Sequence, residues 1–547
     1  MIVPVMKRGG QERGGIGGAW SSFSAAFRLM RAGWILTREG VISALPVEGL
    51  SGLPAFGHKI AGILARPRAR HMQRSERMSR AMNKLGPSYV KLGQFLATRP
   101  DIVGRDVAAD LELLQDRLDF FPQVDAVAAI EGSLGRKIDD LYLQFDAPIA
   151  AASMAQVHPA EIMKDGARQK VAVKVIRPGV RQRFARDLEG FYMVARMQER
   201  HVPFTRRLRP VQVVETLQQT TRIEMDLRLE AAALSEIAEN IKDDAGGFRV
   251  PKVDWERTGR DVLTLEWIDG IKMSDISALE AAGFDLRKLA ETLIQSFLRH
   301  TLRDGFFHAD MHPGNLFVDH QGLIVAVDFG ITGRLNKQQR RFLAEILYGF
   351  ITRDYMRVAE VHFEAGYVPH THDVASFAQA IRAIGEPIHG QPAETISMAK
   401  LLTLLFEVTE LFDMETRPEL LMLQKTMVVV EGVSRTLDPH FNMWKAAEPV
   451  VGDWIARNLG PQGMLLDAKD SAYSLLHFTR KTPELVARVE RVSVALDDMA
   501  VNGLRFDEAT AEAIGRAEAR HSRWGRIAQV VIAISLAAIA IKLYLWL

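Results

Sequence analysis

The sequence predicts an α+β fold with helical flanking regions, followed by a C-terminal transmembrane helix. Residues 105–330 mix short β-branched runs with stretches of helical periodicity, which indicates both strands and helices. Residues 336–520 are rich in Leu, Ala, Glu and Arg and poor in strand-like runs, which indicates mainly helices. Residues 527–547 are apolar with only three polar interruptions. As a helix this last stretch would be roughly 30 Å long, about the thickness of the hydrocarbon core of a bilayer.

Length and composition exclude several classes of protein. At 547 residues the chain is too long for one ordinary domain, so two or more compact units are expected. The 69 basic and 67 acidic residues nearly balance, which disfavours disorder and also nucleic acid as a partner. Because the chain has no cysteine, disulfides, Cys-ligated zinc, iron–sulfur clusters and thiolate nucleophiles are excluded.

Basic and partly apolar sequence dominates residues 1–80 and predicts a segment on a membrane surface. The first 38 residues carry one acidic residue, and from Lys59 to Arg80 seven basic residues accompany a single acid. Arg28 and Arg31 interrupt the only candidate apolar region of a signal peptide, so none is expected. A transit peptide and a solvated helix face are the alternatives to contact with acidic phospholipid headgroups.

The C-terminal apolar stretch is interpreted as a membrane anchor. Lys542 lies near the chain end, where its stem can reach the interface, and Trp524, Tyr544 and Trp546 occupy positions typical of interfacial aromatic residues. Four arginines precede the stretch, so the positive-inside rule keeps the body of the protein in the cytoplasm. The alternative is a buried core helix. Since no transit sequence is convincing, the expected location is a bacterial inner (cytoplasmic) membrane.

The residues that carry chemistry gather between positions 308 and 330. Two short apolar runs around a Gly-containing turn, within residues 316–327, predict a β-hairpin. The hairpin would bring Asn315 and Asp328 to its open end, and Asp310 can reach the same place. Carboxylate and amide oxygens of this kind suit Mg²⁺ held jointly with nucleotide phosphates.

The spacing of these residues is that of a protein-kinase catalytic loop and metal loop. Asp310 and Asn315 form Asp-x-x-x-x-Asn, and Asp328 begins Asp-Phe-Gly after a predicted strand. Upstream, Lys174 lies in a β-rich apolar run, where it can hold phosphate oxygens if a carboxylate such as that of Glu230 orients it. The pattern therefore predicts a kinase-like bilobal fold that binds ATP and Mg²⁺. Asp310 and Lys174 are the expected catalytic residues, and Asn315 and Asp328 the expected metal ligands.

The combination resembles the UbiB/ABC1 family of atypical kinases, involved in ubiquinone (coenzyme Q) biosynthesis, over roughly residues 80–440. Lys91 and Gln94 lie in a sequence similar to the family's Lys-x-Gly-Gln signature, and Glu224 and Asp226 in one similar to its Glu-x-Asp motif. In the family the signature lysine contacts the acidic motif over the active site, which implies that these four residues form a gate. On a regular helix Glu224 and Asp226 point in different directions, so the sequence leaves open which one contacts Lys91.

An alanine-rich run resembles the loop that this family has in place of the kinase glycine-rich loop. Alanine disfavours the positive φ angles that glycine allows, so the loop should fold over phosphates differently. The resemblance implies that the loop binds ATP together with Lys174 and Glu230. Its residues are Ala150, Ala151, Ala152, Ser153, Met154, Ala155, Gln156 and Val157.

Five segments follow from these assignments. Farther along the chain, Lys425-Thr426 and Leu437-Asp438-Pro439 resemble the family's C-terminal helical region. The expected segments are a basic membrane-surface segment at 1–80, an N-lobe with the Lys-x-Gly-Gln helical extension at 81–270, a kinase-like C-lobe at 271–440, a helical region at 441–523 and the transmembrane anchor at 524–547.

The resemblance implies a membrane-anchored ATPase or small-molecule kinase that uses MgATP to support ubiquinone biosynthesis. It also implies isoprenoid quinone precursors, membrane lipids and ubiquinone-biosynthesis enzymes as partners. Ordinary protein phosphorylation is less favoured, because no Ala-Pro-Glu follows residue 330. One alternative is a nucleotide-gated scaffold with negligible turnover. Another is a redox enzyme acting on a quinone precursor, which is disfavoured because the chain has no dinucleotide fingerprint or recognisable iron site.

Overall fold

The computed structural model divides the chain into two compact units, Met1–Ile455 and Ala456–Leu547. Only residues 456–460 of the second unit are described, so the fold below is essentially that of the first. The described residues are 16–44, 53–97, 99–114, 119–201, 208–242, 244, 246–389, 408, 411–414 and 418–460.

The described residues of the first part of the chain, up to residue 112, form helices and no strand. A small apolar core, with side chains such as Leu36, Met78 and Leu111, joins several of them. Gly86, with φ +98°, ends one helix just before Pro87 begins the next. The bounds are α1 (Ile16–Arg38), α2 (Leu53–Leu64), α3 (Pro67–Arg70), α4 (Arg74–Leu85), α5 (Pro87–Ala97), α6 (Pro100–Val103) and α7 (Arg105–Glu112).

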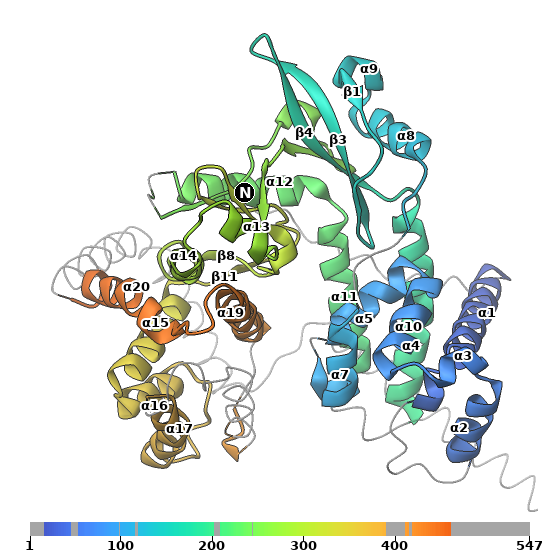
Figure 1. The fold of residues 1–547 in the computed structure, drawn as a ribbon. Coiled ribbons are helices and arrows are strands. Elements are labelled where there is room, and N and C mark those ends of the chain that lie inside the picture. Colours follow the sequence, from blue (N-terminus) through green and yellow to red (C-terminus); the bar gives the residue numbers. More distant parts are fainter. Residues whose placement is uncertain are drawn as a thin grey trace, which may run out of the picture. The chain divides into compact units, whose positions relative to one another are not determined.

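A five-stranded antiparallel sheet follows, in the order β1-β3-β4-β6, with β2 paired to β3. Its long β3–β4 hairpin, at the top of Figure 1, turns at Asp165 and Gly166, which both have positive φ, as a two-residue type I′ turn requires. The elements are α8 (Gln123–Leu134), α9 (Ile138–Leu141), β1 (Gln144–Phe145), β2 (Ala150–Ala151), β3 (Ala155–Lys164), β4 (Ala167–Ile176) and β6 (Val262–Glu266).

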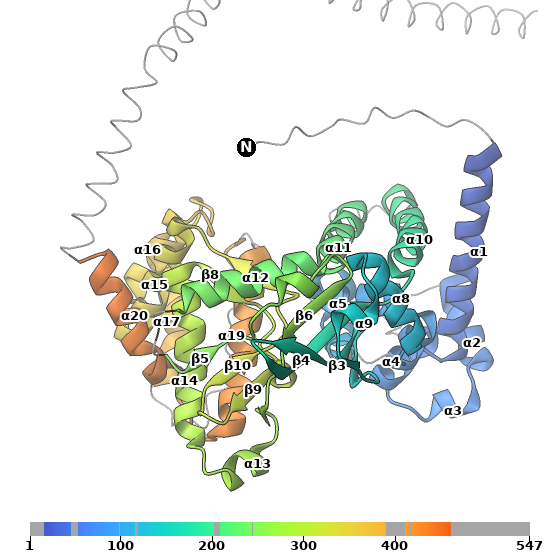
Figure 2. The ribbon, with the colours of Figure 1, turned by 90° about the horizontal axis from the view of Figure 1, so that it is seen from above.

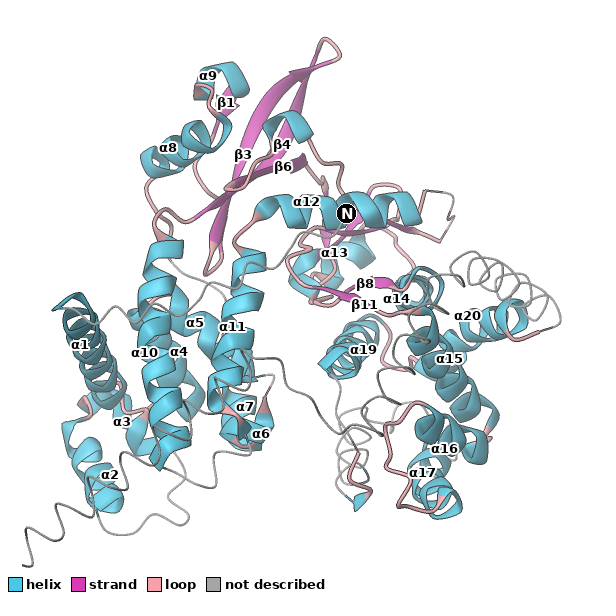
Figure 3. Cartoon of the chain, turned by 180° about the vertical axis from the view of Figure 1, so that it is seen from behind, coloured by secondary structure: helices cyan, strands magenta, loops and turns pink. Residues whose placement is uncertain are grey.

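Three helices lie between β4 and β6 in the chain. Helices α10 (Val180–His201) and α11 (Pro210–Glu224) run side by side (Figure 3), and α12 (Leu227–Asn240) packs against β6 (Figure 2). The side chain of Asp226 accepts a hydrogen bond from the Arg228 N–H and so caps the start of α12.

The second lobe combines short strands with helices. A four-stranded sheet has the order β5-β10-β9-β7, and β8 pairs with β11. Its strands are β5 (Phe248–Arg249), β7 (Gly270–Lys272), β8 (Phe306–His308), β9 (Leu316–Asp319), β10 (Ile324–Ala326) and β11 (Thr332–Arg334). Its helices are α13 (Ile276–Ala281), α14 (Leu286–Arg299), the π-helical turn His300–Asp304, the 3₁₀ turn Pro313–Asn315, α15 (Lys337–Thr352), α16 (Tyr355–Glu364), α17 (Val374–His389), α19 (Pro418–Leu437) and α20 (Met443–Asn458).

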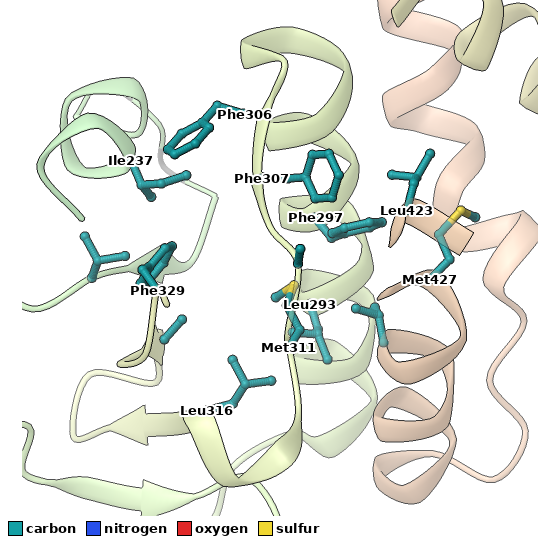
Figure 4. Packing of buried hydrophobic residues seen from close by; sticks show 14 of the residues in the cluster. Ile237, Leu293, Phe297, Phe306, Phe307, Met311, Leu316, Phe329, Leu423 and Met427 are labelled. Carbon is teal, nitrogen blue, oxygen red and sulfur yellow. The ribbon is translucent and has the colours of Figure 1, made fainter. Parts of the chain in front are cut away.

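The main hydrophobic core joins α12, α14, α19 and the short strands near the chemistry-bearing residues. Figure 4 shows Phe297 of α14 and Phe307 of β8 packed beside Leu423 and Met427 of α19. The rings of Phe297 and Phe307 meet edge to face, with centroids 5.8 Å apart. The strands that carry the site are therefore fixed from behind by buried apolar contacts.

The predicted α+β arrangement agrees with these two lobes, but the predicted transmembrane helix needs correction. Among the residues that the structure describes, no helix is long and apolar enough to cross a membrane. The long helix α1, for example, carries Arg28, Arg31 and Arg38, and charges at the centre of a bilayer are costly. The expected anchor at 524–547 lies outside the described residues. The predicted C-terminal anchor in a bacterial inner membrane is therefore not supported.

Candidate active site

Lys174 lies on the central strand β4, between Val157 of β3 and Leu263 of β6. Its ammonium donates to both carboxylate oxygens of Glu230, at 2.8 and 3.0 Å, and to Oδ1 of Asp328 at 3.2 Å. The three charged groups come from β4, α12 and the segment after β10. The structure thus brings together the lysine and the two carboxylates that the sequence analysis singled out.

Glu230 lies one turn into α12, and that turn is fixed by the Asp226 cap. Its side chain is 6% exposed. Burial raises the pKa of Glu230 to about 7, against the lowering effect of the Lys174 charge and with a further rise from Asp328. One cation facing two carboxylates leaves an excess negative charge, so the deeper carboxylate is the one that ionises less readily.

Asp328 and Lys174 keep their charges. Partial loss of solvent around the Asp328 carboxylate favours its neutral form, although the side chain stays 43% exposed. The Lys174 charge and a hydrogen bond from the Gly330 N–H outweigh this effect and lower the pKa of Asp328 to about 2. Burial alone would lower the pKa of Lys174, but the charges of Asp328 and Glu230 raise it above its ordinary value. The cluster therefore offers a permanent cation beside a permanent anion.

The predicted hairpin is present, and its register aligns the next pair of residues. Strands β9 and β10 pair antiparallel with Ala326 opposite Leu316, and the Val327 N–H donates to the Asn315 carbonyl at 3.0 Å. Asn315 and Asp328 consequently flank the open end of the hairpin. The Asn315 amide also donates to the Asp310 carbonyl at 3.3 Å and to its carboxylate at 3.4 Å.

His308 shapes the loop that carries Asp310. Its buried ring accepts a hydrogen bond from the Asp310 N–H at 3.1 Å and lies against Phe329, with ring centroids 4.5 Å apart. Burial lowers the pKa of His308, although the charges of Asp310 and Asp328 oppose this effect. A neutral His308 is consistent with the unprotonated Nδ1 that the Asp310 amide requires.

The structure shows which of the two acidic residues contacts Lys91. The ammonium of Lys91, on α5, lies 2.5 Å from Glu224 at the end of α11, and both side chains are mostly buried, at 14% and 11% exposure. Asp226 instead binds the Arg228 guanidinium. Gln94 is half-buried on the same helix as Lys91. Glu224 is therefore the partner of Lys91, and Asp226 serves as a helix cap.

Gly93, between these two α5 residues, allows a close approach. A methyl group at this position would lie 2.5 Å from Cδ1 of Leu114. Small size at position 93 lets α5 pack closely against the segment that follows α7.

The alanine-rich run forms β2, a tight turn and the start of β3. Ala152 donates to Ala155 at 2.8 Å, and Val157 lies opposite Lys174, so the turn is on the same sheet as the lysine. The side chain of Gln156 is fully buried and bonds both the N–H and the carbonyl of Phe121, at 3.0 and 3.2 Å. Its amide thus fastens the segment before α8, and its role in ATP binding stays a prediction.

Sequence reasoning missed Arg181, which lies at the start of α10. Its guanidinium donates to the carbonyl of Met225, the middle residue of Glu224-Met225-Asp226, and pairs with Asp261 before β6. Arg181 thereby fixes the turn between the two acidic residues. No local signal marks it, because its partners lie 44 or more residues away in the chain.

The donor set fits a divalent cation with nucleotide phosphates. Asp328 is 43% exposed, so its carboxylate can accept a ligand, and Asn315 and Asp310 offer further oxygens nearby. The lysine held by two carboxylates suits phosphate oxygens. The side chains of Lys174, Asp328, Asn315 and Asp310 therefore have the chemistry needed to hold Mg²⁺ and ATP.

Two family models match parts of this chain. Residues 113–362 match the family model of the ABC1 atypical kinase-like domain, and residues 381–442 match that of the UbiB helical domain. Among solved structures, "The complex structure of Rv3197-erythromycin from Mycobacterium tuberculosis" is similar at 25% identity with a TM-score of 0.46, covering 69% of this chain and 97% of that one.

Curated relatives cover most of the chain. A protein of Marinobacter nauticus named "Probable protein kinase UbiB" is 39% identical over 84% of this chain and 84% of its own length. Proteins of the same name from Aeromonas hydrophila and Azotobacter vinelandii are 39% and 38% identical, covering 82% and 78% of this chain and 84% and 80% of their own lengths. The chain therefore belongs to the UbiB family of ABC1 atypical kinase-like proteins.

Proposed function

We propose that this chain is an ATP-dependent phosphotransferase or ATPase that supports ubiquinone biosynthesis. The observation that carries the proposal is the three-way contact of Lys174 with Glu230 and Asp328, beside Asp310 and Asn315. Each residue type that phosphoryl transfer requires is present, and each has a defined place.

The roles follow from the positions of the side chains. Lys174 holds phosphate oxygens while Glu230 keeps its ammonium in place, and Asp328 with Asn315 provides oxygen ligands for Mg²⁺. Bound Mg²⁺ neutralises charge on the phosphates. Asp310 orients or deprotonates the acceptor, a water or a hydroxyl group, from a carboxylate fixed by Asn315.

We propose an isoprenoid quinone precursor, such as a polyprenyl-phenol, as the substrate or cargo. Apolar side chains are exposed at two residues that directly precede charged site residues in the chain. Ile223 precedes Glu224 and is 56% exposed, and Leu229 precedes Glu230 and is 50% exposed. An amphipathic phenol combines a hydroxyl group for Asp310 with a chain that such side chains can contact. Ubiquinone-biosynthesis enzymes that handle the same lipids are the proposed protein partners.

We also propose that helices α1 and α2 contact acidic lipid headgroups. Phe27, Met30 and Trp34 are exposed at helical spacing on α1, and Ile60 and Ile63 are exposed on α2 beside Lys59. Binding of the full chain to vesicles with and without acidic lipid tests this proposal. Trp34→Ser with Ile63→Ser should weaken binding to acidic vesicles, and unchanged binding would contradict it.

The direct test of the enzymatic proposal is Mg²⁺-dependent ATP hydrolysis by the full chain, with and without a polyprenyl-phenol. We expect turnover that the phenol raises and that Asp310→Asn and Asp328→Asn abolish. Asp269→Asn is the matched control, because this exposed carboxylate pairs only with exposed His320 in the described structure and should be silent. ATP binding without turnover above the two variants would contradict the proposal and favour a nucleotide-gated scaffold.

A further inference from the structure

The backbone that carries Asp310 is held from both sides. On one side the Ala309 N–H donates to the Ile331 carbonyl at 3.0 Å, which ties the catalytic loop to the segment after Asp-Phe-Gly. On the other side the Ala309 carbonyl accepts a hydrogen bond from the hydroxyl of Thr426, on α19, at 3.1 Å. Thr426 is 117 residues away in the chain and is 1% exposed.

Helix α19 contacts this loop and packs against the hydrophobic core beside it. Its buried face packs Leu423 and Met427 against the core that contains Phe297 and Met311 (Figure 4). Thr426 is a polar residue in the middle of this apolar face. A buried hydroxyl at such a position is costly unless it is hydrogen-bonded, so its partners are informative.

The hydroxyl of Thr426 has two acceptors but one proton. It donates to the Met422 carbonyl one turn earlier at 2.8 Å and to the Ala309 carbonyl at 3.1 Å, which is a shared, three-centre hydrogen bond. The bond within the helix satisfies the hydroxyl, and the second arm connects the helix to the residue directly before Asp310. Helix α19 lies in the part that matches the UbiB helical domain, whereas Ala309 lies in the kinase-like match.

We propose that Thr426 is a positioning residue for catalysis, through which the helical domain sets the backbone from which the Asp310 carboxylate projects. The inference rests on the proposed function, because it assigns Asp310 to the acceptor. Thr426 itself touches no reacting atom. Its hydroxyl acts through the Ala309 carbonyl and therefore affects the geometry of the chemical step rather than ATP binding.

Three variants separate this role from ordinary packing. Thr426→Val keeps the shape and removes the hydroxyl, and Thr426→Ser keeps the hydroxyl and removes the methyl group. Thr436→Val is the matched control, because Thr436 is on the same helix and its exposed hydroxyl makes only the equivalent bond to the carbonyl one turn earlier, Gly432, at 2.9 Å.

The experiment measures kcat and KM for MgATP in the full chain. We expect Thr426→Val to lower kcat about tenfold with KM for ATP nearly unchanged, since one lost buried hydrogen bond corresponds to roughly that factor. Thr426→Ser should recover most of kcat, and Thr436→Val should match the wild type. A Thr426→Val enzyme as fast as Thr436→Val overturns the inference, as does a Ser variant as slow as the Val variant.

Hydrogen exchange keeps the inference testable apart from the proposed function. If the wild-type chain shows no turnover, the proposed function fails. The hydrogen bond between Thr426 and Ala309 still predicts faster amide exchange in a peptide spanning residues 306–317 of Thr426→Val than in the same peptide of Thr436→Val. Equal exchange in the two variants overturns the inference.

Discussion

Two regions of the site are held together in different ways. In the catalytic region, residues 308–330, most contacts run between near neighbours in the chain, such as Asn315 with Asp310 and with Val327. The hydrogen bond from Thr426 to Ala309 is a long-range exception. In the nucleotide-facing region, ion pairs join distant segments: Lys174 lies 56 residues from Glu230 and 154 from Asp328. The register of the β9–β10 hairpin positions the side chains of the catalytic region, whereas ion pairs position those of the nucleotide-facing region. The second should therefore respond more strongly to pH, metal and charge substitution.

Asp328 belongs to both regions, so its replacement should have the largest effect. Asp328→Asn removes the exposed anionic oxygen expected to bind Mg²⁺ and one of the two partners of Lys174. We expect turnover to fall on the order of 100-fold or more, as when a main electrostatic group of an active site is removed. Steady-state ATP hydrolysis measures the effect, and activity within about tenfold of wild type would show that the two regions do not meet at Asp328.

Replacement of Lys174 should disturb the nucleotide-facing region alone. We expect Lys174→Met to weaken ATP binding roughly 10- to 100-fold, because a desolvated, charge-assisted contact to phosphate is lost. Lys170→Met is the control, since Lys170 is exposed on the same strand and lies over the ring of Trp267. Calorimetric ATP titration gives the ATP affinity of each variant. Equal affinities would show that Lys174 does not contribute to ATP binding.

The ion pair between Lys91 and Glu224 should have a larger coupling free energy than an exposed ion pair. A double-mutant cycle with Lys91→Met and Glu224→Gln should give a coupling free energy of about 1–3 kcal/mol, because both side chains are mostly buried. The exposed pair Lys137 with Glu131 is the reference and should give a clearly smaller coupling free energy, because solvent screens exposed charges. Urea unfolding supplies the four free energies in each cycle. Similar coupling free energies in the two cycles would contradict the claim that burial strengthens the Lys91–Glu224 ion pair.

The pH dependence of the free energy of unfolding should reveal the raised pKa of Glu230. Its pKa is raised in the folded chain to about 7, so it takes up a proton more readily there than in the unfolded chain. Its contribution to stability is then fully present below its ordinary pKa and is lost as pH rises through about 7. Wild type should lose stability relative to Glu230→Gln between about pH 5 and 8, as followed by urea midpoints. A constant difference between the two proteins would contradict the raised pKa.

The sequence predicted the catalytic region better than the nucleotide-facing region, and the reason is physical. Turn residues and apolar alternation are local signals, so they placed Asn315 and Asp328 at one end of a hairpin. The partner of Lys91 depends on how α5 meets α11, which no local pattern encodes.

Three side chains illustrate what local patterns cannot specify. Gln156 lies in a loop motif, yet its amide is used for packing the segment before α8. Arg181 acts on a distant backbone carbonyl. Thr426 was noted only as part of a helical motif, although its position on an apolar helix face was the available signal of a buried polar contact.

ATP affinity with and without Mg²⁺, for wild type and Asp328→Asn, tests the account most directly. The central claim is that Lys174 binds both Glu230 and Asp328, and that the Asp328 carboxylate becomes a ligand of Mg²⁺ when the nucleotide binds. The account predicts that Mg²⁺ strengthens ATP binding about tenfold or more in wild type. It should have little effect in the variant, in which the anionic ligand is replaced by a neutral amide and Lys174 keeps only Glu230 as a charged partner. Equal strengthening by Mg²⁺ in both proteins would contradict the account.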